Sequence, residues 1–162
     1  MTIPVEFREA TPEDLPQIVR LLAEDPLGAQ RERAEQPLAQ TYRDAFERMR
    51  RQPGNRILLA VEASGAVVGC LQLSIIHGLS RHGLTRAQIE GVRVARERRG
   101  AGIGEALLRH AIALAKREGC GLAQLTTDRR REEAHRFYER LGFKASHLGM
   151  KLDLAAEGGA AP

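Results

Sequence analysis

A glycine-rich loop in the second half of the chain constrains its fold most strongly: Arg99-Gly100-Ala101-Gly102-Ile103-Gly104. The loop follows a strand-like segment, residues 89–94, and precedes a helix-like segment, residues 105–118. Glycines remove side chains where the backbone must bend tightly and approach a ligand, so several N–H groups can converge on one anion at a helix N-terminus. We therefore expect the loop to bind a phosphate group, most simply the pyrophosphate of a cofactor.

Other uses of glycine compete with this interpretation. A tight strand-to-helix turn can contain glycine for packing alone. A Rossmann site requires Gly-x-Gly-x-x-Gly, whereas the spacing here is Gly-x-Gly-x-Gly, and a P-loop requires a following Gly-Lys-Ser/Thr that the chain lacks. The loop therefore indicates an anion site of a different kind.

Hydrophobic periodicity and turn residues predict an α+β fold along the rest of the chain. A first strand includes Val5 and Phe7, and further strands are expected at residues 56–62, 66–76, 86–95 and 122–127. Helices are expected at residues 12–23, 34–51, 105–118 and 132–141, the last closed by Gly142 in a left-handed conformation. Residues 143–145 and 148–152 would form a closing hairpin. The strand–loop–helix–strand order in the second half predicts a right-handed crossover and hence a locally parallel sheet.

The length and composition fit a single domain. A chain of 162 residues with 43% hydrophobic content suits one core. We expect one domain over residues 1–154 and a frayed tail over residues 155–162. Neither an export signal nor an apolar run of membrane-spanning length is apparent, so we expect a cytoplasmic protein that does not contact a membrane.

Metal and nucleic-acid binding are not expected. Cys70 and Cys120 form no Cys-x-x-Cys pattern, and the five histidines show no ligand spacing, so we interpret the thiols as structural and predict no metal. Basic residues exceed acidic ones, 25 to 21, but the two kinds are interleaved, and aromatic residues make up 4% of the chain. These features are typical of solvated helix faces rather than of a nucleic-acid surface.

Two motifs in a fixed order carry a resemblance to a known family. The first is Arg99-x-x-Gly102-x-Gly104 preceded by Val92-Arg93-Val94, and the second is Phe-Tyr-Glu-Arg-Leu-Gly-Phe at residues 137–143. This combination resembles the GNAT superfamily of acyl-CoA-dependent N-acetyltransferases, closely over residues 89–144 and more weakly over residues 3–154. The resemblance implies a mixed, mostly antiparallel sheet of about six to seven strands, splayed in the middle and flanked by about four helices. It also implies transfer of an acetyl group from acetyl-CoA to a primary amine of a small molecule or peptide.

The resemblance also implies a cofactor site. The pantetheine arm would lie beside the strand that precedes the loop and bond the backbone groups of Val92 and Val94, as in strand addition. Loop amides would receive the pyrophosphate, and Arg99 would add a charge-assisted contact, although a solvated arginine is the alternative. The loop residues concerned are Gly100, Ala101, Gly102, Ile103 and Gly104.

Two side chains are candidates for proton transfer. Tyr138 matches the family tyrosine that donates a proton or hydrogen bond to the leaving thiolate; packing in the core is the alternative. Glu90 is the candidate general base, because an alkyl ammonium with a pKa of about 10 must lose its proton before attack. A carboxylate paired with an arginine such as Arg93 is the alternative for Glu90.

Several points stay open at this level. Arg131 stands where many family members have an asparagine that contacts the cofactor arm. The loop at residues 76–85 either lines the acceptor site or is a flexible turn. Asp25, Glu32 and Glu35 could recognise a cationic acceptor, but the fold does not choose the amine. A homodimer is plausible. The competing function is a non-catalytic acyl-CoA-binding module with a regulatory or partner-binding role.

Overall fold

The computed structural model describes residues 4–26 and 28–154. They fall into two compact units, the first ending at Leu125 and the second beginning at Thr126. Each unit is described by itself below. The expected tail at residues 155–162 lies outside the described residues.

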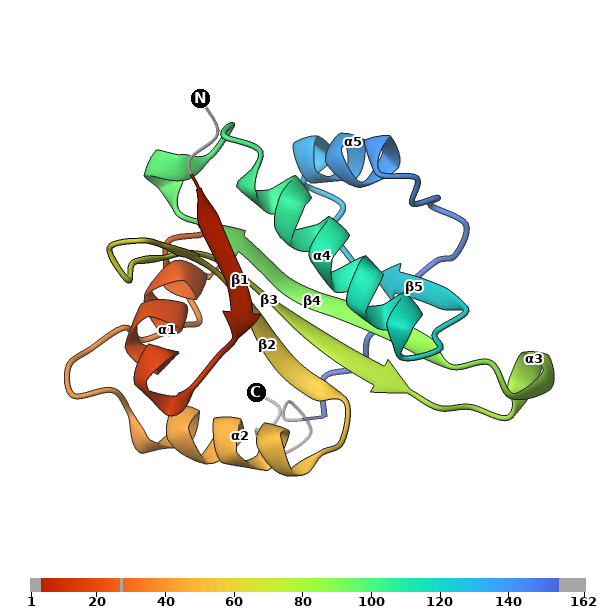
Figure 1. Cartoon of the computed structure of the whole chain (residues 1–162), viewed down its shortest axis with the longest axis horizontal. Helices are drawn as coiled ribbons and strands as arrows, with labels where there is room; N and C mark the ends of the chain where they lie inside the picture. Colours follow the sequence, from red (N-terminus) through yellow and green to blue (C-terminus); the bar gives the residue numbers. More distant parts are fainter. Residues whose placement is uncertain (1–3, 27, 155–162) are drawn as a thin grey trace, which may run out of the picture. The chain divides into compact units, whose positions relative to one another are not determined.

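A five-stranded sheet forms the centre of the first unit (Figure 1). Its strands lie in chain order: β1 (Val5–Glu9), β2 (Asn55–Glu62), β3 (Val67–Ile76), β4 (Arg86–Val94) and β5 (Leu122–Leu125). The first three pairings are antiparallel, and β4 pairs with β5 in parallel. The expected mixed, mostly antiparallel sheet is thus confirmed, including the parallel step.

The four expected long helices are present, with changed bounds. They are α1 (Leu15–Ala23), preceded by the 3₁₀ turn η1 (Pro12–Asp14), α2 (Gln40–Arg51), α4 (Ile103–Arg117) and, in the second unit, α5 (Glu132–Arg140). Two short turns, α3 (Ser80–Gly83) and η2 (Arg96–Arg98), complete the elements. The expected start of α2 at residue 34 was wrong, because Pro37 lacks an amide donor and restricts the residue before it.

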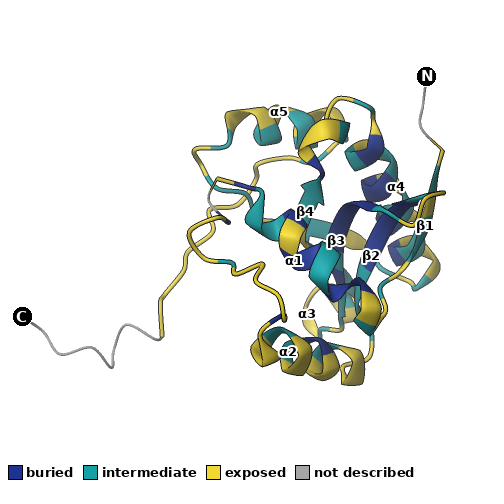
Figure 2. Cartoon of the chain, turned by 90° about the vertical axis from the view of Figure 1, so that its left-hand side faces the viewer, coloured by how far each residue is buried: buried dark blue, intermediate teal, exposed yellow. Residues whose placement is uncertain are grey.

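The two faces of the sheet meet different helices. Side chains in direct register share a face, and successive residues alternate between faces. On the face we call the α4 face, the Phe7 ring stacks on His110 of α4 at 5.1 Å between centroids. On the opposite α1 face, Ile57 packs against a buried cluster from α1, α2 and the loop between them: Leu15, Val19, Leu38 and Phe46. Figure 2 shows the buried residues concentrated on β2 and β3, while α2 is largely exposed.

The expected closing hairpin was wrong. Residues 143–154 contain no strand, so the described residues have five strands rather than six to seven. Leu148, Met150 and Leu152 are 72%, 91% and 76% exposed, and extended backbone gains little without a buried face. The described part of the second unit also offers no strand with which they could form a ladder. Gly142, in contrast, has the expected left-handed conformation after α5, with φ of 91°.

A buried carboxylate holds the turn that begins α1. Asp14 is 6% exposed and receives two hydrogen bonds from the Arg8 guanidinium, at 2.7 and 2.8 Å. It also accepts the backbone N–H of Thr11 at 2.8 Å. These bonds lower the pKa of the Asp14 carboxyl, chiefly through Arg8. They join β1 to the turn that begins α1.

Replacing Asp14 with Asn should lower the free energy of unfolding at pH 7 by about 2 kcal/mol, because the neutral amide loses the charge-assisted bonds. The depressed folded pKa means that this contribution is complete above the unfolded value of about 3.9 and is lost as the pH falls through the folded value. Urea unfolding at neutral and acidic pH should therefore show a smaller difference between wild type and variant in acid. The control Asp44→Asn removes the charge of an exposed side chain that accepts a bond from Gln40, and it should change stability by less than about 0.5 kcal/mol. Equal losses in the two variants would contradict this role.

Candidate functional site

Strand β4 carries a bulge beside the predicted site residues. Cys70 of β3 pairs with Arg93, and Gln72 pairs with Glu90, so Gly91 and Val92 together oppose a single residue of β3. Gly91 has a φ of 60°, which a residue without a side chain adopts readily. A bulge of this kind bends the strand and redirects its side chains.

Beyond the bulge, β4 has an open edge. Strand β5 pairs with β4 over residues 86–89 alone, and no strand of the described residues pairs with residues 90–94 on that side. The Ala95 amide donates to the Val68 carbonyl of β3 at 2.9 Å, so by alternation the backbone groups of Val94 face away from β3. The backbone predicted to bind the pantetheine arm therefore lies on an unpaired strand edge.

Arginine side chains contact two carbonyls of this segment. Arg93 donates to the Val92 carbonyl at 2.8 Å, and Arg99 donates through Nε to the Val94 carbonyl at 3.3 Å. The structure thus brings together two predicted cofactor residues, Val94 and Arg99. Because Arg99 is exposed and its bond is long, an incoming hydrogen-bonding chain can replace it.

The glycine loop opens onto the start of α4. Gly100 and Gly102 have φ of 81° and 79°, and no atom lies within 4 Å of where their Cβ atoms would be. Gly102 is the N-cap of α4 and supplies no side-chain cap, so the first amides of the helix keep their donors. Ile103 is buried, and Gly104 lies within the first turn of α4. This arrangement suits an anion, which the helix dipole also favours.

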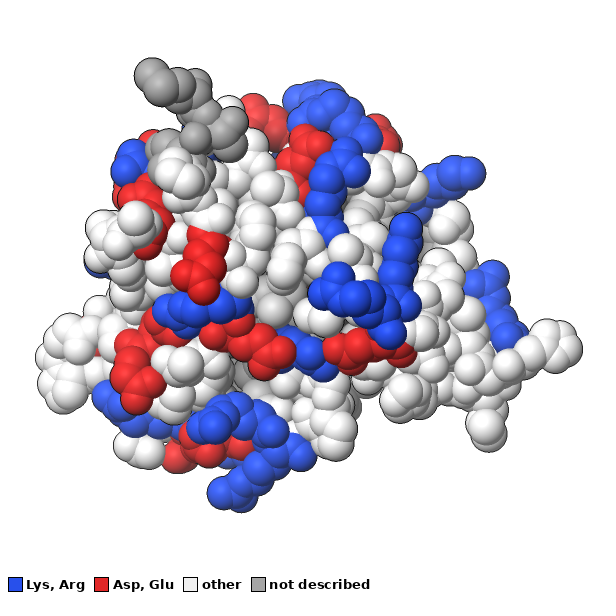
Figure 3. Space-filling model, in the orientation of Figure 1, with Lys and Arg blue, Asp and Glu red and all other residues white. Residues whose placement is uncertain are grey.

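The arginines around the loop have separate roles. Arg98 forms an ion pair with Glu62 of β2 at 2.6 Å and so ties η2 to the sheet. Arg99 takes part in no ion pair among the described residues, which leaves its charge available to a ligand. Figure 3 shows basic and acidic side chains interleaved on the face it displays, rather than one broad basic patch.

Glu90 lies at the bulge on the α1 face, exposed and in register with Gln72. The alternative pairing with Arg93 is not among the ion pairs of the described residues; Arg93 lies 3.7 Å from the carboxylate of Asp25 instead. Asp25 is buried and accepts the Gly28 amide at 3.1 Å, so it anchors the loop after α1. Glu32, the second acid considered for a cationic acceptor, accepts the hydroxyl of Tyr42 at 2.8 Å.

Tyr138 belongs to the second unit, where α5 presents it half-buried. Its ring meets Phe143 edge-on at 6.0 Å and Phe137 at 5.3 Å between centroids. The Phe143 amide donates a hydrogen bond to the Tyr138 carbonyl at 3.1 Å, so the turn at Gly142 fixes this aromatic contact. Arg131 is the N-cap residue of α5 and uses no side-chain bond for the cap.

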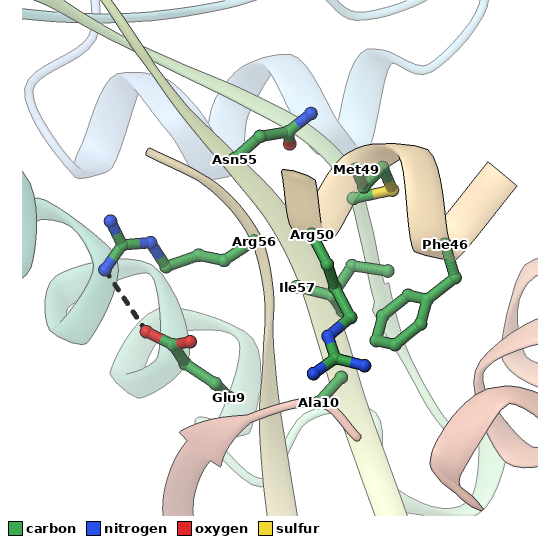
Figure 4. A pocket seen from close by; sticks show the side chains of 8 residues that line it. All are labelled: Glu9, Ala10, Phe46, Met49, Arg50, Asn55, Arg56 and Ile57. Atoms are coloured by element: carbon green, nitrogen blue, oxygen red, sulfur yellow. Dashed lines mark hydrogen bonds and ion pairs between the residues drawn. The ribbon is translucent and has the colours of Figure 1, made fainter. Parts of the chain in front are cut away.

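A pocket that the sequence did not indicate lies between α2 and the start of β2 (Figure 4). Its lining comes from three elements: Glu9, Ala10, Phe46, Met49, Arg50, Asn55, Arg56 and Ile57. Asn55 begins β2, whereas the glycine loop follows the strand end at which Val94 pairs with Gly69, so the pocket is at the opposite end of the strands. It is therefore not the predicted cofactor site. Periodicity predicted α2 but could not show where that helix lies on the sheet.

Residues 4–26 and 28–154 show neither a metal-binding cluster nor a membrane-spanning helix. They contain no group of three or more His, Cys, Asp or Glu side chains that could hold a metal ion. In the same residues, no helix is both long and apolar enough to cross a membrane.

Comparison with known proteins gives a consistent result. The profile of the acetyltransferase (GNAT) family matches residues 15–143. The aminoalkylphosphonate N-acetyltransferase of Salmonella typhimurium is 33% identical over 88% of this chain and 87% of its own length. The glucosamine 6-phosphate N-acetyltransferase of Trypanosoma brucei brucei is 36% identical over 57% of this chain and 61% of its own length. A crystal structure named as a transcriptional regulator from Bacillus halodurans is 47% identical, with a TM-score of 0.90 over 93% of this chain and all of that one.

These matches confirm the resemblance carried by the two motifs and the function that it implied. The chain is an N-acetyltransferase, an acyltransferase that acetylates an amine. With the profile matching well over half of its length, the chain belongs to the acetyltransferase (GNAT) family.

Proposed function

We propose that acetyl-CoA binds along the open edge of β4 with its pyrophosphate at the glycine loop. The observation that carries the proposal is the unpaired edge at Val92 and Val94, which leads directly into the uncapped start of α4. The pantetheine amides would bond the strand backbone, and the amides from Gly100 to Gly104 would bond the pyrophosphate. Arg99 would supply the charge-assisted contact.

Gly102→Ala should weaken CoA binding at least tenfold, because a methyl group would occupy the surface that the pyrophosphate approaches. Gly119→Ala is a matched control: Gly119 follows the other end of α4, has a φ of 81° and also has nothing within 4 Å of its Cβ position. Both variants should lose similar stability from the left-handed backbone, about 1 kcal/mol each. Calorimetry with CoA and with acetyl-pantetheine separates the contribution of the pyrophosphate to affinity from the rest, since acetyl-pantetheine lacks the pyrophosphate. Equal CoA affinity in the two variants would remove the loop from the cofactor site.

For the chemical step, we assign Glu90 as the base and Tyr138 as the acid. The acceptor ammonium gives a proton to the Glu90 carboxylate, directly or through water, and the amine then attacks the thioester carbonyl carbon. The new C–N bond forms as the C–S bond breaks. The departing thiolate takes the Tyr138 hydroxyl proton, and the second proton lost from the newly bonded nitrogen restores that hydroxyl through water. The exposed carboxylate beside the bulge, without an arginine partner among the described residues, supports the first role.

Glu90→Gln should lower kcat by about 10²-fold or more without changing CoA affinity, because the amide cannot accept the proton. The deficit should shrink as the pH rises toward the amine pKa of about 10, where the acceptor deprotonates unaided. Glu6→Gln, at an exposed position of β1, is the control and should keep full activity. Tyr138→Phe should lower kcat by about tenfold or more, whereas Tyr42→Phe should not. Full activity in both site variants would reject these assignments, and CoA binding without turnover on any amine would favour the non-catalytic alternative.

A covalent acyl-cysteine route is a distinct possibility that the burial of Cys70 disfavours. Burial raises the pKa of the Cys70 thiol to about 12, so it stays protonated and a poor nucleophile. We expect a thiol reagent to label Cys120, which is half-buried, much faster than Cys70 in the native protein. Both should react after unfolding in urea. A stoichiometric burst of CoA release without acceptor, lost in Cys70→Ala, would contradict direct transfer.

For the acceptor, we propose a small primary amine that also carries a phosphate or phosphonate group. The names of both curated relatives describe acceptors that combine these two groups. The proposal is tested by measuring thiol release from acetyl-CoA with phosphorylated and unphosphorylated amines.

A further inference from the structure

A row of polar side chains crosses the α1 face at one level of four adjacent strands. Strand register places the four residues side by side: Asn55, Ser74, Gln88 and Gln124. Two of the three neighbouring pairs are hydrogen-bonded, Gln124 Nε2 to Gln88 Oε1 at 2.8 Å and Ser74 Oγ to Asn55 Oδ1 at 3.1 Å. Gln72, one level along β3, also donates to Asn55 Oδ1 at 3.0 Å. We call these five residues the polar row.

The internal bonds leave polar atoms of the row without protein partners. Gln88 uses its carbonyl oxygen and keeps both N–H donors, while Gln124 and Gln72 each keep a carbonyl oxygen. Among the described residues, Nε of Arg93 is the one buried side-chain nitrogen or oxygen without a hydrogen-bond partner. The remaining atoms of the row therefore reach solvent. Together they offer donors and acceptors, the combination that matches hydroxyl groups.

The row lies between two charges on the same face of β4. Glu90 is one level away from Gln88 toward the bulge, and Arg86 is one level away in the other direction. Residues two apart on a strand share a face, so the order along β4 is carboxylate, carboxamide, guanidinium. Arg86 takes part in no ion pair among the described residues. At about 3.3 Å per residue, the two charged positions are about 13 Å apart.

We propose that this face binds a hydroxyl-rich amine phosphate, such as an amino sugar phosphate. The amine lies at Glu90, the hydroxyls lie on the polar row, and the phosphate meets Arg86. This inference rests on the proposed function of Glu90 and deepens it by naming the acceptor class. A short aminoalkylphosphonate matches this track less well, because its two charged groups lie closer together and it has no hydroxyls for the row.

Acetyl transfer to glucosamine 6-phosphate, glucosamine and aminoethylphosphonate tests the inference. In the wild type, we expect kcat/KM for the sugar phosphate to exceed that for aminoethylphosphonate at least tenfold. Gln88→Met, which keeps the side-chain length, should raise KM for both sugars about tenfold and leave KM for acetyl-CoA unchanged. Arg86→Met should raise KM for the phosphorylated sugar alone. Arg109→Met, an exposed arginine of α4, is the control and should change neither.

Two kinetic outcomes would overturn the inference. One is a wild type that prefers aminoethylphosphonate, and the other is an equal effect of Gln88→Met on all acceptors. Thermal melting of each variant separates lost binding from lost folding. Calorimetric titration of the CoA-bound protein with glucosamine 6-phosphate measures acceptor affinity and does not depend on turnover. If the wild type binds the sugar phosphate, Gln88→Met weakens that binding and no amine is acetylated, the polar row stands as an acceptor site and the catalytic assignments are rejected. If the wild type does not bind the sugar phosphate, the polar row is rejected as an acceptor site.

Discussion

The loss of a strand partner halfway along β4 is the constraint on which the rest of the site depends. Up to Ile89, β4 is an interior strand with neighbours on both sides; after it, the bulge at Gly91 and Val92 turns the strand while β5 ends. Exposed backbone donors and acceptors on a strand edge bind another extended chain readily. An edge of a few residues that runs into a helix start therefore suits both an extended ligand and an anion, with little demand on side chains.

Two ion pairs tie the residues around this edge to other parts of the first unit. Arg93 meets buried Asp25 after α1, and Arg98 meets Glu62 of β2. Removing one partner of a buried pair leaves an uncompensated charge, so such contacts fix position more than they add stability. The loop after α1 and the turn before the glycine loop are in this way tied to the same short stretch of β4 and β2.

Sequence reasoning predicted the parts of the site that local patterns determine. The glycine spacing identified the loop, and apolar, β-branched runs joined by a short turn identified β2 and β3, because both signals lie within a few consecutive residues. The bulge at Gly91 and the polar row were missed, since each depends on register between strands that are distant in sequence. The alternative that paired Glu90 with Arg93 failed for the same reason: the partner of Arg93 is Asp25, almost seventy residues earlier. The closing hairpin expected at residues 143–145 and 148–152 is absent from the described residues, because the apolar side chains of its second segment have no buried face to pack against.

The bond from Arg99 to the Val94 carbonyl means that the unliganded edge is already partly satisfied. If acetyl-CoA binds as proposed, it exchanges hydrogen bonds at this carbonyl rather than adding one, so the net gain there is small. The guanidinium released from the strand would then be free to turn toward the pyrophosphate. One side chain would thus act as a placeholder in the empty state and as an anion ligand in the loaded state, which favours ready release of CoA after transfer.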